Sequence, residues 1–131
     1  MPSLTLPSVP RSVSRAVDAV EAAVVECGLS DEVLGRASLA VGEAVANAIE
    51  HGNRGEAHRR FGISISRRVG ALDVTVCDDG EGVAAQQIAV AKLPDDPLQT
   101  DGRGLYMIRL LSDETEVRGS CLRLTFRERT T

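Results

Sequence analysis

The chain has 131 residues, of which 43% are hydrophobic and 26% charged, and its formal net charge is −4. This length predicts a single domain over residues 1–131, and the composition is typical of a globular protein in water. No apolar run approaches the ~18 residues of a membrane span, and the acidic charge with 2% aromatic residues disfavours a nucleic-acid-binding surface. The N-terminal segment lacks the basic start and apolar core of a secretory signal, so we expect a cytoplasmic protein.

Apolar residues at helical spacing predict the helices, and alternation of apolar and polar residues predicts the strands. In chain order, we expect a strand at 3–8, helices at 11–27 and 31–52, strands at 61–69 and 72–78, a short helix at 84–93, a loop at 94–104, a helix at 105–112 and a hairpin over 115–129. Hairpin connections predict a mixed, mainly antiparallel sheet. Helices would then cover one face of it, which is the two-layer α/β sandwich of the α+β class.

The three cysteines, Cys27, Cys77 and Cys121, are scattered along the chain and form no CxxC motif. This spacing argues against a zinc site and against a disulfide framework. We therefore expect three buried, reduced thiols, as is usual in cytoplasmic proteins.

The segment EAVANAIEHG, residues 43–52, places polar side chains on an otherwise apolar helix. Glu43, Asn47 and Glu50 are spaced i, i+4, i+7 and therefore share one side of that helix. One interpretation is the solvated face of an amphipathic helix. The other is an acid/base group beside a metal ligand, because Mg²⁺ takes only one or two protein oxygens together with waters and substrate phosphates.

The segment VCDDGEGV, residues 76–83, ends a predicted strand in a glycine-rich turn. Gly80 and Gly82 would let a planar ligand approach the backbone, and Asp78 could accept a hydrogen bond from an exocyclic amine such as that of adenine. An acidic surface turn is the simpler interpretation. The GxGxxA spacing that ends at Ala85 is also a weak dinucleotide fingerprint. Against it, the paired aspartates would repel a pyrophosphate, and the strand lies in a hairpin rather than in a βαβ unit.

The segment TDGRGLYMI, residues 100–108, leads a polar loop into a helix. Free backbone N–H groups and the helix dipole favour an anion there, and Arg103 between Gly102 and Gly104 adds a positive charge. An ordinary capped helix is the alternative. The P-loop pattern GxxxxGK[ST] is absent, as are the HRD and DFG patterns of eukaryotic-type protein kinases.

In this order, EAVANAIEHG, DDGEGV and DGRGLYMI resemble the N, G1 and G2 boxes of the GHKL ATP-binding superfamily, and the resemblance covers about residues 30–128. The wording GRGLYMIRLLSDETEV is most similar to the bacterial anti-sigma-factor serine kinases. The resemblance implies a histidine-kinase-like ATPase domain of Bergerat type. Between the G1 and G2 boxes, the segment at about 83–101 is short and polar for a lid over ATP.

The resemblance also implies roles for single residues. Glu43 would be the general base, Asn47 the Mg²⁺ ligand, and Asp78 the acceptor for the adenine amino group. The remaining implied contacts to ATP are Gly80 and Gly82 beside the base, Gly102, Arg103 and Gly104 along the phosphates, and Thr125 assisting adenine binding through water. Glu50 receives no role beyond the solvated face, and for His51 we expect a structural hydrogen bond.

The function that the resemblance implies is an ATP- and Mg²⁺-dependent protein serine kinase that is also an anti-sigma factor. It would sequester a sigma factor and phosphorylate a STAS-type anti-anti-sigma protein, and it would be a homodimer. Two alternatives remain open. One is a non-catalytic ATP-binding module that binds a partner, and the other is a stressosome-type switch kinase that binds no sigma factor.

Overall fold

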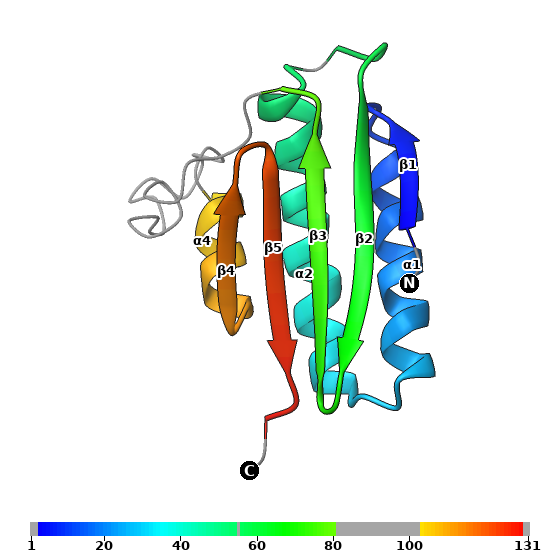
Figure 1. Ribbon diagram of the computed structural model, residues 1–131, viewed down its shortest axis with the longest axis vertical. Coiled ribbons are helices and arrows are strands. Elements are labelled where there is room, and N and C mark those ends of the chain that lie inside the picture. The colour runs from blue at the N-terminus through cyan, green and yellow to red at the C-terminus, as the bar shows by residue number, and fades with distance from the viewer. Residues whose placement is uncertain (1–2, 55, 81–102, 130–131) are drawn as a thin grey trace.

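Figure 1 shows the computed structural model of the chain, which describes residues 3–54, 56–80 and 103–129. Its elements in chain order are β1 (Ser3–Pro7), α1 (Ser12–Glu26), α2 (Asp31–Asn47), the π-helix η1 (Ala48–Gly52), β2 (Arg60–Arg68), β3 (Ala71–Asp78), α4 (Arg103–Leu111), β4 (Glu114–Arg118) and β5 (Cys121–Arg127). The predicted strands and long helices are confirmed. The short helix expected at 84–93 and most of the loop expected at 94–104 lie outside the described residues.

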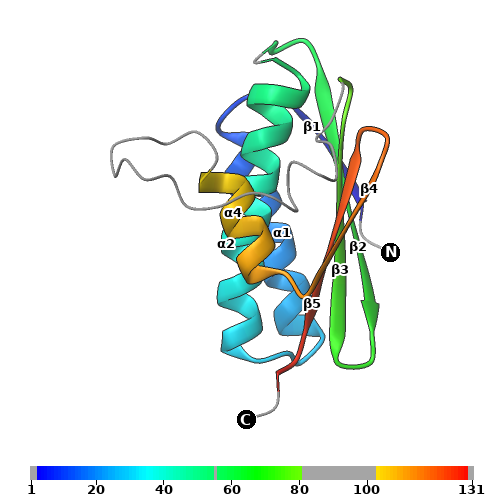
Figure 2. The same cartoon turned by 90° about the vertical axis from the view of Figure 1, so that its left-hand side faces the viewer.

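The strands form one sheet in the order β1-β2-β3-β5-β4, and every neighbouring pair is antiparallel. The sheet is therefore antiparallel throughout the described residues, not mixed. Figure 2 shows α1, α2 and α4 on the same side of the sheet, while the described residues place no helix on its other face. The α+β, two-layer sandwich expected from the sequence is confirmed.

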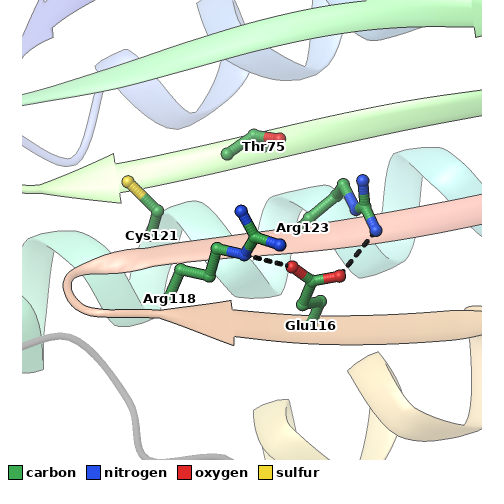
Figure 3. Close-up of a pocket in the computed structure, with 5 residues that line it drawn as sticks. All are labelled: Thr75, Glu116, Arg118, Cys121 and Arg123. Carbon is green, nitrogen blue, oxygen red and sulfur yellow. Dashed lines mark hydrogen bonds and ion pairs between the residues drawn. The ribbon is translucent and has the colours of Figure 1, made fainter.

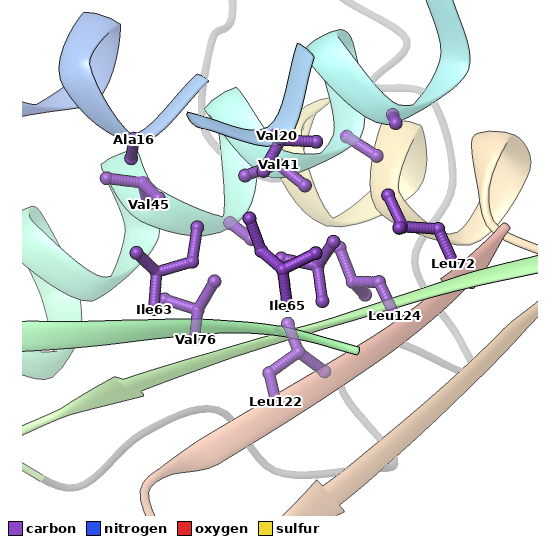
Figure 4. Close-up of a cluster of buried hydrophobic side chains, with 14 of the residues drawn as sticks. Ala16, Val20, Val41, Val45, Ile63, Ile65, Leu72, Val76, Leu122 and Leu124 are labelled. Atoms are coloured by element: carbon purple, nitrogen blue, oxygen red, sulfur yellow. The ribbon is translucent and has the colours of Figure 1, made fainter. Parts of the chain in front are cut away.

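The hydrophobic core lies between these two layers. In Figure 4, Val41 and Val45 of α2 face Ile63 and Ile65 of β2, and all four side chains are buried. Each fully buried side chain of this kind contributes about 1.5–3 kcal/mol relative to an exposed one. The sheet contributes every second strand residue to this core, because successive residues of a strand point to opposite faces of the sheet.

The ends of the helices agree with their local sequence. The Ser30 hydroxyl caps α2 by accepting a hydrogen bond from the Val33 N–H at 3.3 Å, and Asp31 adds a negative charge in the first turn, where the helix dipole favours it. The sequence predicted an α-helix that continues to residue 52. Instead, the helix widens after Asn47 into the π-helix η1. None of the described helices has the length and apolarity needed to cross a membrane.

A buried arginine that the sequence analysis did not single out joins α2 to two other elements. Arg36 is only 5% exposed, and its guanidinium donates to Glu32 at 2.6 and 2.9 Å and to Asp113 at 2.9 Å. It also donates to the backbone carbonyls of Leu111 at 3.1 Å and Arg127 at 2.6 Å. All five N–H donors of the guanidinium are thereby used, so the buried charge is fully solvated by the protein.

The carboxylates around this arginine are held in their charged form. Burial alone would raise the pKa of Asp113, but hydrogen bonds from the Arg127 backbone and from Arg36 outweigh it and lower that pKa below its usual value of 3.8. The hydrogen bond from Arg36 likewise lowers the pKa of Glu32. Asp113 therefore stabilises the folded state only while it is ionised.

The structure overturns the expectation of three reduced thiols. Cys77 of β3 and Cys121 of β5 form a disulfide, whereas Cys27 is free and half-buried. Cys77 and Cys121 are 44 residues apart in sequence, but the register of β3 and β5 sets them directly opposite each other, with 4.0 Å between their Cα atoms. Spacing along the chain carries no information about such pairing, and this is why the sequence argument failed.

The Asp113–Arg36 contact predicts a specific loss of stability in acid. Because the folded-state pKa of Asp113 is depressed, its contribution is present above the usual value of 3.8 and disappears as the pH falls through the folded-state pKa. At pH 7 we expect Asp113→Asn to lower the free energy of unfolding by about 1–3 kcal/mol. As the pH falls through the depressed folded-state pKa of Asp113, this difference between the wild type and the variant should shrink, since Asp113 then becomes neutral as well. Urea denaturation across this pH range measures the difference, and a gap that stays constant with pH would contradict the assignment.

The disulfide predicts a thiol count that depends on reduction. Under denaturing, non-reducing conditions, alkylation should label Cys27 alone, and after reduction it should label all three cysteines. Mass spectrometry counts the added groups. Because the bridge closes a loop of more than forty residues, its removal in Cys77→Ser/Cys121→Ser should lower the free energy of unfolding by up to about 4 kcal/mol. Three labelled thiols without reduction would show that the bridge does not form.

Candidate functional site

The start of α4 lies directly against the polar side of α2. A Cβ atom added to Gly104 would lie 2.8 Å from Oε2 of Glu43 and 3.8 Å from Nδ2 of Asn47. These distances show that Gly104, from the third motif, lies directly against the Glu43 carboxylate and close to the Asn47 amide, both from the first. The spacing i, i+4 had predicted that the two α2 residues share a face, and the structure adds that this face meets α4.

The side chain of Asn47 ends in a buried amide without a protein partner. Its Nδ2 atom is inaccessible to water and makes no hydrogen bond with any described residue. Leaving such a group unpaired costs about 1–3 kcal/mol, so a ligand that completes its bonding is expected. Because the amide can turn over, its oxygen can face the same space, and an amide oxygen beside the Glu43 carboxylate is a suitable donor set for Mg²⁺. The residues present therefore fit the implied metal.

Asp78 is the last residue of β3, at the end of the sheet next to which η1 also ends. It lies directly opposite Phe61 of β2, which is buried in the core, so the Asp78 side chain extends from the face of the sheet that the helices cover. The side chain is half-buried, and its Oδ1 accepts a hydrogen bond from the Gly80 N–H at 2.8 Å. The backbone N–H of Asp78 donates to the Ser120 carbonyl at 3.1 Å, which ties this strand end to the β4–β5 turn.

A buried asparagine connects the first motif to the second. Asn53 is fully buried at the end of η1, and its Oδ1 accepts a hydrogen bond from the Asp79 N–H at 2.8 Å. The Asp79 carboxylate in turn accepts from the Arg60 N–H at 2.8 Å. The turn after Asp78 is thus held by side chains from both neighbouring segments. In the sequence, Asn53 marked only the end of a helix.

The other polar residues of the first motif face solvent. Glu50 and His51 are both exposed, which agrees with the solvated face expected for Glu50. His51 was expected to form a structural hydrogen bond, but its exposure leaves it no buried role. The π-helix that carries both residues is a rare element that is frequent at functional sites.

Thr125 is not part of this site. Its hydroxyl donates to Oδ1 of Asp73 at 2.6 Å, and Asp73 is its direct neighbour across the β3–β5 register. Asp73 and Asp78 are five positions apart on β3, so their side chains point to opposite faces of the sheet. The sequence-based assignment of Thr125 to adenine binding is therefore wrong.

The hydroxyl of Thr125 belongs instead to an ion-pair cluster on the open face of the sheet. Burial alone would raise the pKa of Asp73, but hydrogen bonds from Thr125 and from Arg68 outweigh it and lower that pKa. The role of Asp73 and Thr125 is to join β3, β5 and the β2 arginine across the sheet.

A hollow of about 230 Å³ lies on the same open face and is lined by Thr75, Glu116, Arg118, Cys121 and Arg123 (Figure 3). Glu116 lies between the two arginines and pairs with Arg118 at 2.5 Å and with Arg123 at 2.7 Å. Because it lies on the opposite face of the sheet from Glu43 and Asp78, this hollow is not part of the candidate site.

The remaining predicted residues are only partly described. Arg103 is the first residue of α4 and is half-buried, next to Gly104. Gly80 follows β3, and its N–H donates a hydrogen bond to the Asp78 carboxylate. Gly82 and Gly102 lie outside the described residues. The structure thus brings Glu43, Asn47 and Gly104 close together and places Asp78 and Gly80 at the end of β3 next to η1. Among the described residues, no cluster of histidine, cysteine and acidic side chains forms a metal site of its own.

The chain is similar in sequence to two proteins of the same name. The chain is 26% identical over 121 residues to "Serine-protein kinase RsbW" of Listeria innocua serovar 6a, and the match covers 88% of the chain and 77% of that protein. It is 35% identical over 92 residues to the protein of the same name from Bacillus velezensis, where the match covers 63% of the chain and 55% of the relative.

A solved structure with the same fold contains the RsbU and RsbW domains of a Mycobacterium tuberculosis protein. It superposes with a TM-score of 0.61 at 18% sequence identity, and the match covers 98% of this chain and 32% of the mycobacterial one. At this identity the likeness establishes the fold alone.

The family profile described as "Histidine kinase-like ATPase domain" matches residues 6–127, which include both helical motifs and the end of β3. With a match across nearly the whole chain, the protein belongs to the GHKL-type histidine kinase-like ATPase domain family.

Proposed function

We propose that this chain is an ATP-dependent protein serine kinase that also sequesters a sigma factor and phosphorylates a STAS-type anti-anti-sigma protein. The observation that carries the proposal is the close approach of Gly104 to Glu43 and Asn47. This contact joins an acid/base group and an amide donor to the start of a helix, where phosphates bind well. The two relatives named serine-protein kinase support the same activity.

In the proposed reaction, each residue near the contact has a distinct task. The Asp78 carboxylate would accept a hydrogen bond from the adenine amino group and thereby select ATP. Backbone N–H groups at the start of α4, together with Arg103, would bind the phosphates. The Glu43 carboxylate would accept the proton of the substrate serine hydroxyl as the hydroxyl attacks the γ-phosphate.

The Asn47 amide oxygen would hold Mg²⁺ next to Glu43. When bound, that ion supplies positive charge to the phosphates of ATP, while the protein mainly orients the reacting groups. Because Glu43 is only half-buried, its carboxylate is accessible to the hydroxyl of a protein substrate.

The proposed partners follow from the same family. The unphosphorylated STAS-type protein would bind the kinase and displace the sigma factor, and its phosphorylation would release the kinase to bind the sigma factor again. We further propose that the described fold is one domain spanning 1–131, that it acts as a homodimer, and that it works in the cytoplasm with these partners.

Two variants separate nucleotide binding from phosphate transfer. Asp78→Ala should abolish ATP binding in calorimetry, because the adenine amino group loses its charged hydrogen-bond acceptor. Glu43→Ala should bind ATP normally but transfer radiolabelled phosphate to a STAS-domain protein about 10²–10⁴-fold more slowly, since it loses the general base.

The same assay discriminates the alternatives. A wild type that binds ATP but transfers no phosphate would be a binding module, and a wild type that phosphorylates the STAS domain but binds no sigma factor would be a stressosome-type switch kinase. Unchanged ATP affinity in Asp78→Ala would refute the adenine assignment.

Gly104→Ala tests the contact between α4 and α2. The new Cβ would lie 2.8 Å from Oε2 of Glu43, and the flexible carboxylate would have to move. We expect a folded protein of nearly unchanged stability whose phosphate transfer is about a hundredfold slower, because a displacement near 1 Å misaligns the base.

Gly35→Ala is the matched control for this variant. Gly35 also lies in a helix, but an added Cβ there meets nothing within 4 Å. This control should transfer phosphate at the wild-type rate. Equal activity of both alanine variants would show that the contact does not position Glu43.

A further inference from the structure

We propose that Asn53 is a positioning residue that fixes the location of the Asp78 carboxylate and thereby sets the preference for adenine over other purines. The inference rests on the proposed function, because it takes Asp78 as the group that contacts the base. It adds a residue outside the three motifs, and it names the property that this residue controls.

The first step is the burial and bonding of the Asn53 side chain. It is 0% exposed, and its Nδ2 donates to the Arg60 carbonyl at 2.9 Å and to the Ser8 hydroxyl at 3.3 Å. Its Oδ1 accepts from the Asp79 N–H at 2.8 Å. Both N–H donors and the carbonyl oxygen are therefore used, and the amide cannot turn over, because a carbonyl only accepts and a backbone N–H only donates.

The second step is the set of segments that Asn53 joins. Its own backbone N–H donates to the Ala48 carbonyl at 2.8 Å, which fixes it to the π-helix directly after Asn47. Through its side chain it binds the segment after β1, the start of β2 and the turn after β3. The end of α2 and η1 and the end of β3, which carries Asp78, are thus connected by one side chain.

The third step is the turn itself. Asp79 is bound twice, since its N–H donates to Asn53 and its carboxylate accepts from the Arg60 N–H at 2.8 Å. Asp78 precedes it and accepts from the Gly80 N–H at 2.8 Å. Any shift of Asp79 away from Asn53 must move the backbone on which the Asp78 carboxylate is carried. Adenine recognition by that carboxylate needs it within hydrogen-bonding distance of the amine, so such a shift weakens recognition of the base.

The test compares ATP with inosine triphosphate, which has no exocyclic amine. Wild-type protein should bind ATP about tenfold to a hundredfold more tightly than inosine triphosphate, the range of one charge-assisted hydrogen bond. In Asn53→Ala, calorimetry should show this preference reduced to about threefold or less, with ATP binding weakened and inosine triphosphate binding nearly unchanged. If Asn53→Ala does not fold, Asn53→Ser is measured in its place with the same expectation.

Val24→Ala is the control for stability. Val24 is buried near the C-terminal end of α1, at the opposite end of the molecule from Asp78 (Figure 1), and its truncation destabilises the core without touching the turn. This control should keep the full preference for ATP even where its melting temperature falls as far as that of Asn53→Ala. A purely structural role for Asn53 would lower the melting temperature and leave the nucleotide preference at its wild-type value, and that result would overturn the proposal.

The failure of this inference is distinct from a failure of the proposed function. Wild-type protein that binds neither nucleotide would overturn the proposed function. Wild-type protein that discriminates between the two nucleotides, with an Asn53→Ala variant that discriminates equally well, would overturn only the role of Asn53.

Discussion

At the start of α4, the missing side chain of Gly104 leaves space for the Glu43 carboxylate, and at the other end the Arg36 guanidinium binds the Leu111 carbonyl. Gly104 and Leu111 are as far apart in sequence as Arg36 and Glu43, so the two helices run antiparallel with contacts at both ends. A side chain at 104 would displace the Glu43 carboxylate, and an unpaired Arg36 would leave a charge in the core. The geometry of the candidate site depends on this double attachment of α4 to α2.

Much of the fold could be predicted from local patterns. The helices and hairpins have strong hydrophobic periodicity. The ends of two elements are also marked by local sequence signals, namely the Ser30 cap of α2 and the turn at Gly70, which has a φ of +70°. The position of Glu43 and Asn47 on one face of α2 also followed from helical spacing. What made the three motifs a site, however, was their order along the chain and their likeness to a family, because each motif alone is compatible with an ordinary helix face or turn.

Features that depend on strand register could not be predicted in the same way. The Cys77–Cys121 bridge requires β5 to insert beside β3 in one register, and the five donors of Arg36 find partners on α2, α4, β5 and the segment after α4. The bonds of Asn53 likewise come from segments far apart in sequence. Such groups are satisfied by tertiary structure, and their partners leave no spacing signal in the chain.

The error for Thr125 is different, because the sequence did contain the information to avoid it. Val74 and Val76 are apolar and lie four and two positions before Asp78, so Asp78 shares their face of the strand. Thr125 lies between the apolar residues Leu124 and Phe126, so it points to the face opposite theirs. Alternation therefore assigns Asp78 to the face that the core residues share and Thr125 to the opposite face, and the register confirms it. A resemblance transferred residue by residue has to respect this parity. Where it does not, as for Thr125, the sheet itself separates the transferred side chain from the site.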